Sequence, residues 1–393
     1  NAEINQVSSF DRKNYFYPDL PKGYQITQMA MPIVGKGSIK IFANGEEKII
    51  NITRAHLEED AGKSVHDLFE GETGIDLNRA GTPLLEIVSE PEIANAKEAV
   101  AYFKAIRQIV TFLDICDGVM AEGSMRCDVN VSMKKVDDSE LGTRAEIKNI
   151  NSFKFIERAI AFEIDRQTKI LESGGSVAQE TRLYDSVKNE TRSMRSKEEA
   201  NDYRYFPEPD LLPVVISDKE LEEIRSSLPE LPEQKEKRYI NEVKLEASEA
   251  RIIASSKTMA NMFEEACLKT DDSSLVARWL VGEVSALLNK DNIEIDESNL
   301  TSNNFAVLIG RISDKTISGK IAKSVLEEIW ESGDGVDAII KDKGLVQIQD
   351  ESLLESIAKK IVEDNPGQVN AYKGGKDRLF GFFVGQVMKE TQG

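Results

Sequence analysis

The sequence has few of the residues on which many catalytic sites depend. Its 393 residues include two histidines, His56 and His66, and three cysteines. The cysteines, Cys116, Cys127 and Cys267, form no CxxC pair, which argues against a zinc site and against a disulfide framework. Two histidines leave little room for a catalytic triad or a three-histidine metal site. Scattered cysteines suit a reducing compartment, and we expect a cytoplasmic protein or its organellar equivalent.

Several motifs of nucleotide-binding and hydrolytic enzymes are also missing. There is no GxxxxGK(S/T) loop, no GxGxxG after a strand pattern and no GxSxG sequence. These absences argue against a P-loop, a Rossmann dinucleotide site and the nucleophile elbow of an α/β-hydrolase. The sequence has no run of about 18 apolar residues, so no membrane association is expected.

Charged residues, by contrast, are abundant, and acidic ones are in excess. The 69 Asp and Glu residues outnumber the 50 Lys and Arg residues, which gives a net charge of −19. An acidic average argues against nucleic-acid binding, because affinity for phosphate backbones comes mostly from Lys and Arg, but it does not exclude a local basic face. Phosphoryl transfer relies on positioning and on charge neutralisation by metal ions and basic groups, and the composition suits that chemistry.

Carboxylates and basic residues are concentrated between positions 56 and 86. The segment begins with HLEEDAGK at positions 56–63 and ends with DLNRAGTPLLE at positions 76–86. A hard divalent cation binds several carboxylate oxygens, and a nucleotide phosphate needs Lys and Arg beside that cation. The same residues also fit a solvated acidic loop beside a hairpin, which composition alone favours.

The hydrophobic pattern predicts an α+β fold, with a mixed first part followed by helices. Asn44 and Gly45 stand between two strand patterns and predict a hairpin, and residues 127–133 and 143–148 predict an antiparallel pair. Residues 89–92 resemble a capping box that begins a helix. After residue 217, apolar residues recur at helical spacing and predict the core of an all-α region.

Several stretches resemble signature sequences of one family, the B subunit of the tRNA-dependent amidotransferase, which is the aspartyl/glutamyl-tRNA(Asn/Gln) amidotransferase. The stretches are FDRKNYFYPDLPKGYQITQ, HLEEDAGKS, DLNRAGTPLLEIVSEPEI, EGSMRCDVNVS, RAEIKNINSFKFIERAI, QETRLYD, TRSMRSKEEANDYRYFPEPDLLP, ISGKIAK and GLVQI. The resemblance covers residues 10–393. In that family further residues precede the first stretch and follow the last, so the chain resembles a fragment at both ends.

The resemblance implies a fold and a function. It implies an α+β cradle at residues 1–220 with an ATP and magnesium site, a helical domain at 221–343 and a small helical tail at 344–393. The family uses ATP and Mg²⁺ to phosphorylate the side-chain carboxylate of Glu-tRNA(Gln) or Asp-tRNA(Asn). Ammonia from a separate amidase (A) subunit then gives the amide, and a small C subunit completes the complex.

The resemblance also implies site residues. Glu59 and Glu86 match magnesium-binding positions of the family, Arg79 is a further catalytic candidate, and we expect Glu59 and Glu86 to converge in space. Read from the residues alone, Glu59 could equally cap a helix or pair with Lys63. The family site also uses a Glu and a His from an upstream segment, for which His56 is no substitute, so we expect a half-built metal site.

Basic and aromatic residues supply the remaining candidates. Lys13, Tyr15 and Lys148 are expected to contact the nucleotide and its phosphates. Lys373 and Lys376 lie on either side of two glycines, where a backbone can approach a phosphate closely, and are expected to contact tRNA. Two other functions remain open, namely a non-catalytic tRNA-binding or assembly subunit and a stand-alone ATP-dependent carboxylate–amine ligase.

Overall fold

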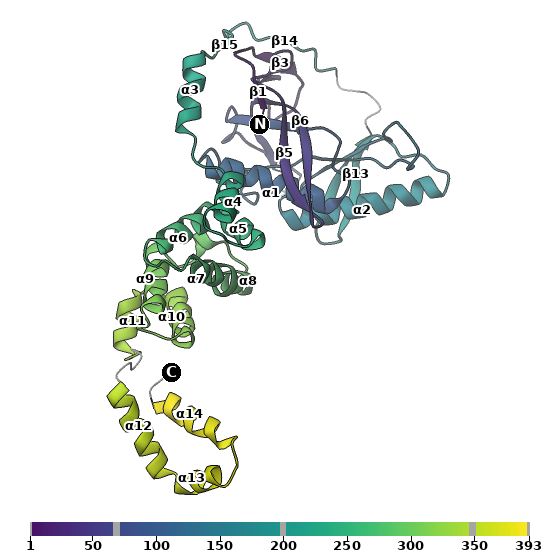
Figure 1. Cartoon of the computed structure of the whole chain (residues 1–393). Helices are drawn as coiled ribbons and strands as arrows, with labels where there is room; N and C mark the ends of the chain where they lie inside the picture. Colours follow the sequence, from purple (N-terminus) through teal and green to yellow (C-terminus); the bar gives the residue numbers. More distant parts are fainter. Residues whose placement is uncertain (1, 66–70, 197–201, 346–350, 391–393) are drawn as a thin grey trace. The chain divides into compact units, whose positions relative to one another are not determined.

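The computed structural model describes residues 2–65, 71–196, 202–345 and 351–390 (Figure 1). The chain forms two compact units, Asn1–Pro229 and Glu230–Gly393, which we call the sheet unit and the helical unit. Within the described residues, the strands belong to the sheet unit and the helical unit contains helices only. The expected α+β fold class is confirmed. The finer division at residues 220 and 343 stays a prediction, and residues 346–350, at the start of the expected tail, lie outside the described residues.

The main sheet of the sheet unit has four antiparallel strands in the order β1-β5-β6-β9. These strands are β1 (Ala2–Ile4), β5 (Val34–Ala43), β6 (Glu46–Glu59) and β9 (Pro83–Ser89). The predicted hairpin joins β5 to β6, and Asn44 and Gly45 at its tip have φ of 56° and 87°. Positive φ at both positions matches the twist of the strands, which is why Asn-Gly is favoured there.

A second sheet follows, with strands in the order β10-β11-β12-β13. Its strands are β10 (Val129–Val131), β11 (Ala145–Lys148), β12 (Glu180–Asp185) and β13 (Glu190–Ser196). The predicted antiparallel pair is confirmed, because β10 pairs with β11 and Asn130 lies opposite Glu146. Strands β11 and β12 are parallel, and the crossover between them contains the helix α2 (Phe153–Glu172).

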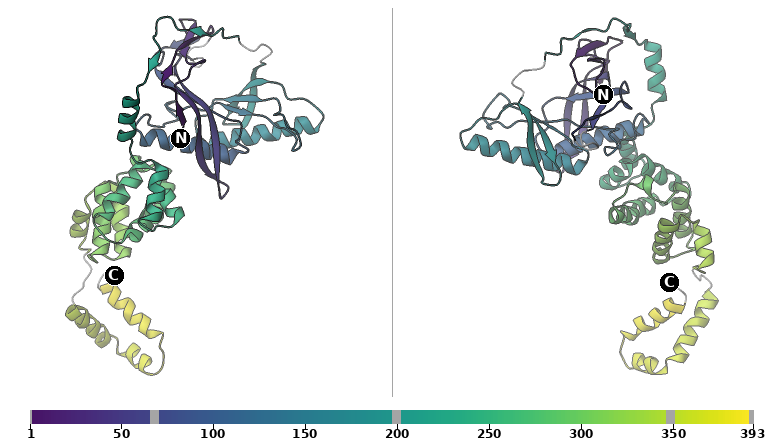
Figure 2. Two further views of the ribbon diagram at one scale, coloured as in Figure 1. Left: turned by 45° about the horizontal axis from the view of Figure 1, so that its top comes forward. Right: turned by 180° about the vertical axis from the view of Figure 1, so that it is seen from behind.

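Two long helices pack on these sheets. Figure 2 shows α1 (Ala96–Phe112) against β5, and α1 also contacts α2. The expected helix start at residues 89–92 is wrong. Ser89 still belongs to β9, and the Glu92 carboxylate accepts hydrogen bonds from Asn51 instead. The helix begins after Asn95, whose side chain accepts from the Glu98 amide and so caps the first turn.

The end of the sheet unit returns to its beginning. Strand β14 (Phe206–Pro207) pairs with β3 (Asp11–Asn14), and β15 (Val214–Val215) pairs with β2 (Val7–Ser8). The remaining elements are β4 (Tyr24–Thr27), β7 (Lys63–Val65), β8 (Gly74–Asp76) and α3 (Asp218–Ser227). The Arg12 guanidinium donates two hydrogen bonds of 2.8 Å to the buried Glu208 carboxylate. This pairing brings segment 202–216 beside the N-terminal strands.

The helical unit has an apolar core built from helical stripes. Its first helices are α4 (Pro232–Asn241), α5 (Ala247–Ala254), α6 (Lys257–Cys267), α7 (Ser273–Arg278) and α8 (Ser285–Asp291), followed by α9 (Ser302–Ser313), α10 (Gly319–Ser332) and α11 (Val336–Asp342). Leu280, Phe305 and Val325 are fully buried, which confirms that the predicted stripes form a core. The last helices, α12 (Glu351–Asp364), α13 (Pro366–Lys373) and α14 (Leu379–Glu390), contact one another. Among the described residues, no helix has the length and apolar character needed to cross a membrane.

Candidate functional site

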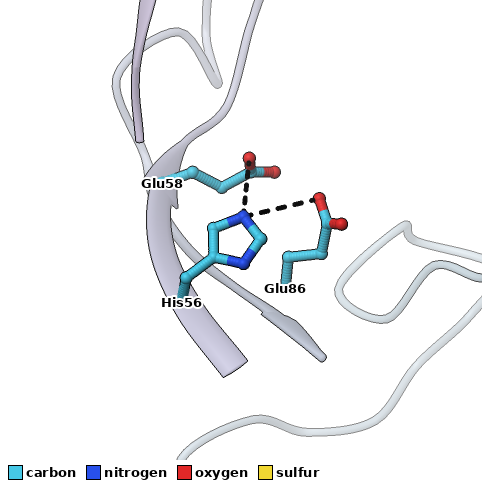
Figure 3. Close-up of side chains that lie close together, drawn as sticks. All are labelled: His56, Glu58 and Glu86. Atoms are coloured by element: carbon cyan, nitrogen blue, oxygen red, sulfur yellow. Dashed lines mark ion pairs between the residues drawn. The ribbon is translucent and has the colours of Figure 1, made fainter. Parts of the chain in front are cut away.

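Three potential metal ligands meet on the pair of strands β6 and β9. His56 and Glu58 are alternate residues of β6 and so share one face of the sheet, and Glu86 of β9 lies directly opposite His56 in the register. The His56 Nε2 atom is 3.8 Å from Glu58 Oε2 and 3.9 Å from Glu86 Oε2 (Figure 3). The ligand atoms of the three side chains lie within 4.8 Å of one another. We call these residues the carboxylate cluster.

The carboxylate cluster is buried on one side and open on the other. The His56 and Glu58 side chains are 5% and 12% exposed, whereas the Glu86 side chain is 49% exposed. The Arg54 guanidinium donates to His56 Nδ1 over 3.4 Å, and the Nε2 atom of the same ring faces the two carboxylates. Glu86 is therefore the member of the cluster that a ligand from solvent can reach.

The structure does not bring Glu59 and Glu86 together, contrary to our expectation. Side chains alternate along β6, so Glu59 points to the face opposite Glu58. There its Oε1 atom accepts a hydrogen bond of 2.8 Å from the Ile26 amide and forms an ion pair with Lys22. Glu58 takes the place that we assigned to Glu59 beside Glu86. A metal-binding role for Glu59 stays a prediction that nothing in this geometry supports.

His56 and Glu58 are residues that our sequence reasoning missed. The family resemblance led us to set His56 aside, and the choice between adjacent glutamates was made without a strand register. The available signal was the alternation of polar residues in HLEED, which places its first and third residues on one face of a strand. That signal becomes decisive only when the neighbouring strand is known.

Lys13 and Tyr15 belong to a row of aromatic rings near the carboxylate cluster. The ring of Tyr15 is 6.1 Å from that of Tyr203, which is 6.0 Å from that of Tyr205. The Lys13 ammonium lies 5.0 Å from the Tyr203 ring centre, within the range of a cation–π contact. Sequence reasoning placed Lys13 and Tyr15 near the nucleotide but gave no role to the two tyrosines of the returning segment.

The pKa values of these tyrosines reflect their surroundings. Burial, followed by the nearby charge of Glu58, raises the pKa of Tyr15 to about 12. Burial also raises the pKa of Tyr205, with further contributions from Tyr203 and Glu86. Both rings therefore keep their phenolic hydrogens at neutral pH.

Arg79 connects two turns beside the cluster. Its guanidinium donates to the backbone oxygens of Glu122 and Gly123 over 3.1 and 2.9 Å, and its Nε atom is 3.4 Å from Asp60 Oδ2. Gly123 has a φ of 75°, and a Cβ atom there would lie 3.0 Å from the Arg79 Nη1 atom. Most of the donors of Arg79 are thus used within the protein.

Lys148 lies on the second sheet and is paired there. Its ammonium is 2.7 Å from Asp128 Oδ2 and 3.0 Å from Glu146 Oε1. Burial lowers the pKa of Lys148, but the two carboxylates outweigh burial and the net shift is upward. The side chain stays charged, yet its partners are acidic residues of the same sheet. A contact between Lys148 and a nucleotide stays a prediction.

Lys373 and Lys376 are exposed at the junction of α13 and α14. Lys373 ends α13, and Lys376 follows Gly375, which has a φ of 94°. Glycine accepts such a φ without strain, so the tight turn between the two lysines is a consequence of the sequence. Both lysines belong to the helical unit and are no part of the carboxylate cluster.

Comparison with known proteins decides the family. Residues 1–222 match the family described as the GatB/GatE catalytic domain, and residues 261–393 match the GatB domain. The B subunit of the aspartyl/glutamyl-tRNA(Asn/Gln) amidotransferase from Thioalkalivibrio sulfidiphilus is 57% identical over 396 residues, which cover all of this chain and 83% of that protein. The corresponding protein of Hydrogenovibrio crunogenus is 58% identical over 393 residues, covering all of this chain and 82% of that protein.

This chain belongs to the family of amidotransferase B subunits. The resemblance seen in the sequence motifs is thereby confirmed over the whole chain. The carboxylate cluster, the tyrosine row and Arg79 all lie in the region that matches the catalytic domain of this family. Lys373 and Lys376 lie in the region that matches the second domain. The family assignment and the geometry therefore point to the same unit of the molecule for catalysis.

Proposed function

We propose that this protein uses ATP to activate the side-chain carboxylate of Glu-tRNA(Gln) or Asp-tRNA(Asn). The carboxylate would attack the γ-phosphorus of ATP, and ADP would leave with the electrons of the bond that breaks. Ammonia would then displace phosphate from the acyl phosphate and give the amide. The observation that carries the proposal is the carboxylate cluster of His56, Glu58 and Glu86 within the region that matches a catalytic domain.

The donor set of the cluster fits a divalent cation. Glu58 and Glu86 offer the hard oxygen ligands that Mg²⁺ prefers, and they would hold it together with water and phosphate oxygens. His56 suits a supporting role, because Arg54 donates to its Nδ1 atom and its Nε2 atom lies beside both carboxylates. A bound Mg²⁺ would neutralise charge on the transferred phosphoryl group.

Other residues of the sheet unit would orient the nucleotide. Lys13 supplies a positive charge for phosphates, and Tyr15 offers a ring on which a base can stack, next to the ring of Tyr203. Arg79 and Lys148 would neutralise phosphate charge in the same proposal, Arg79 from a position fixed by backbone oxygens. Phosphoryl transfer depends largely on such positioning and charge, so no protein nucleophile is needed.

The ammonia would come from a partner. Burial raises the pKa of the Cys127 thiol to about 12 and that of the Cys267 thiol to about 11, so neither is a thiolate nucleophile at neutral pH. We infer that an amidase (A) subunit releases ammonia from glutamine, and that a small C subunit completes a cytoplasmic complex. The names of the relatives, which describe one lettered subunit of a tRNA amidotransferase, support partner subunits and a tRNA substrate.

The central test is Glu86→Gln in the complete complex. We expect carboxylate activation to be lost, because the exposed ligand of the cluster loses its charge, whereas glutamine hydrolysis by the partner continues. Glu47→Gln is a matched control, since Glu47 lies on the same sheet and its side chain is 58% exposed. Formation of acyl phosphate and of amidated tRNA would be measured separately. Normal amidation by Glu86→Gln would refute the proposed site.

The runner-up function, a non-catalytic tRNA-binding or assembly subunit, rests on the helical unit. We propose that Lys373 and Lys376 contact the tRNA backbone, whether the protein is catalytic or only binds tRNA. In Lys373→Ala/Lys376→Ala, the slope of log affinity against log salt should fall by roughly one for each phosphate that is no longer neutralised. Lys219→Ala/Lys237→Ala removes two exposed lysines elsewhere and serves as the control. An unchanged slope would mean that these lysines do not touch tRNA.

A further inference from the structure

A single carboxylate, Asp60, holds two arginines close to the carboxylate cluster. The Asp60 side chain is 9% exposed, and its Oδ2 atom lies 3.4 Å from Arg79 Nε. The same oxygen accepts a hydrogen bond from Arg126 Nη2. Two guanidinium groups therefore share one negative charge, and a surplus of positive charge remains.

The two arginines differ in how many of their N–H donors are available to a ligand. Arg79 uses its Nη1 and Nη2 atoms to bind the backbone oxygens of Glu122 and Gly123. Among the described residues, Asp60 is the ion-pair partner of Arg126, and the Arg126 side chain is 54% exposed. A guanidinium has five N–H donors, so most of those on Arg126 are available to a ligand. Arg79 therefore holds the local backbone in place, whereas Arg126 can bind a ligand.

The backbone around Asp60 holds this arrangement in place. The Asp60 amide donates to the Thr82 oxygen over 2.8 Å, and the Gly81 amide donates to the Asp60 oxygen over 2.9 Å. Gly81 has a φ of 79°, which glycine adopts without strain. The carboxylate that orients Arg126 is thus fixed between the end of β6 and the start of β9.

The arginine pair lies next to the carboxylate cluster along the same two strands. Asp60 is two positions beyond Glu58, and a strand rises about 3.3 Å per residue, so the separation along the chain direction is about 7 Å. Thr82, which binds the Asp60 amide, immediately precedes the strand that carries Glu86. A nucleotide polyphosphate is long enough to reach both places at once.

We propose that Arg126, positioned by Asp60, binds a phosphate group of the substrate nucleotide. The inference rests on the proposed function, because it assumes that ATP binds at the carboxylate cluster. A guanidinium matches phosphate oxygens in a bidentate geometry, and its charge does not depend on pH. Asp60 and Arg79 are positioning residues in this arrangement, and Arg126 is the residue that contacts the ligand.

The experiment compares ATP with adenosine as ligands of the full chain in its complex, in the presence of Mg²⁺. For Arg126→Ala we expect ATP binding to weaken by about 10- to 100-fold, because a charge-assisted pair of hydrogen bonds is lost. Adenosine has no phosphate, so its binding should stay unchanged. Arg126→Lys should recover part of the loss. Arg192→Ala is the matched control, because Arg192 is paired with Asp185 and its side chain is 57% exposed.

Other outcomes would overturn the inference. An equal loss for ATP and adenosine would mean that Arg126→Ala disturbs the fold of the site. Weaker tRNA binding with unchanged ATP affinity would assign Arg126 to the RNA backbone instead. Unchanged ATP affinity, together with loss of activation in Glu86→Gln, would refute the role of Arg126 alone. Absence of ATP binding to the parent complex would refute the proposed function itself.

Discussion

The two units of this protein bury different kinds of side chain. Within the described residues, the buried polar and charged side chains all belong to the sheet unit, and they include His56, Asp60, Glu163 and Glu208. The largest apolar cluster, in contrast, lies entirely in the helical unit. Burying a polar group is costly unless it is paired, so the sheet unit depends on buried hydrogen-bond networks in a way that the helical unit does not.

This difference indicates where chemistry can take place. A buried network fixes the direction of charged groups before a ligand arrives, and such fixed charges are what phosphoryl transfer requires. The helical unit resembles a stable scaffold, because its core is apolar and its charged side chains lie at the surface. The contrast predicts that the stability losses caused by substitutions in the two units will differ in their response to pH.

The largest effect on stability is expected from the Glu163 network in the sheet unit. The buried Glu163 carboxylate accepts hydrogen bonds from Arg166, Gln167 and Thr191. Glu163→Ala removes this shared acceptor and leaves the Arg166 charge without its buried partner, which should cost about 3–5 kcal/mol. Hydrogen exchange of the α2 amides would measure the loss, with the exposed Glu157→Ala as control. A loss below about 1 kcal/mol would contradict the idea that the network holds this unit together.

In the helical unit, we expect a loss of stability of comparable size from a substitution that involves no charged group. Leu308 is fully buried in the apolar core, so Leu308→Ala should cost about 2–5 kcal/mol. Both tryptophans of the chain, Trp279 and Trp330, are buried in this unit, so their fluorescence during urea unfolding reports on it. Leu268→Ala, at a side chain that is 85% exposed, should change stability by less than about 0.5 kcal/mol. Equal losses for the two variants would refute the assignment of the core.

The smallest effect concerns pH. The hydrogen bond from Arg12 holds the pKa of Glu208 below its ordinary value of 4.5. A carboxylate whose pKa is lowered by folding stabilises the protein above its ordinary pKa, and this contribution is lost as the pH falls through the folded value. The stability difference between the parent and Glu208→Gln should therefore be greatest at neutral pH and shrink below pH 4.5. The Leu308→Ala difference should not follow this pattern, and a parallel pH dependence of the two would contradict the comparison.

Much of the architecture could be predicted from sequence because its causes are local. Asn44 and Gly45 fixed a hairpin through their tolerance of positive φ, and apolar residues at helical spacing identified the core of the helical unit. The start of α1 was mistaken, because Glu92 found a partner on a neighbouring strand instead of capping a helix. Local signals fail where a distant group competes for the same side chain.

The candidate site likewise has some features that the sequence predicts and others that only the tertiary structure decides. The segment at positions 56–86 attracts attention by its carboxylates, but only the family resemblance predicts that Glu59 and Glu86 are metal ligands. Only the tertiary structure decided that Glu58, and not Glu59, faces Glu86, since the choice depends on strand register. It also decided that Lys22 pairs with Glu59 and that Tyr203 lies beside Tyr15. The physical reason is that a side chain's type is written in the sequence, but its partners depend on which distant strands come to lie next to it.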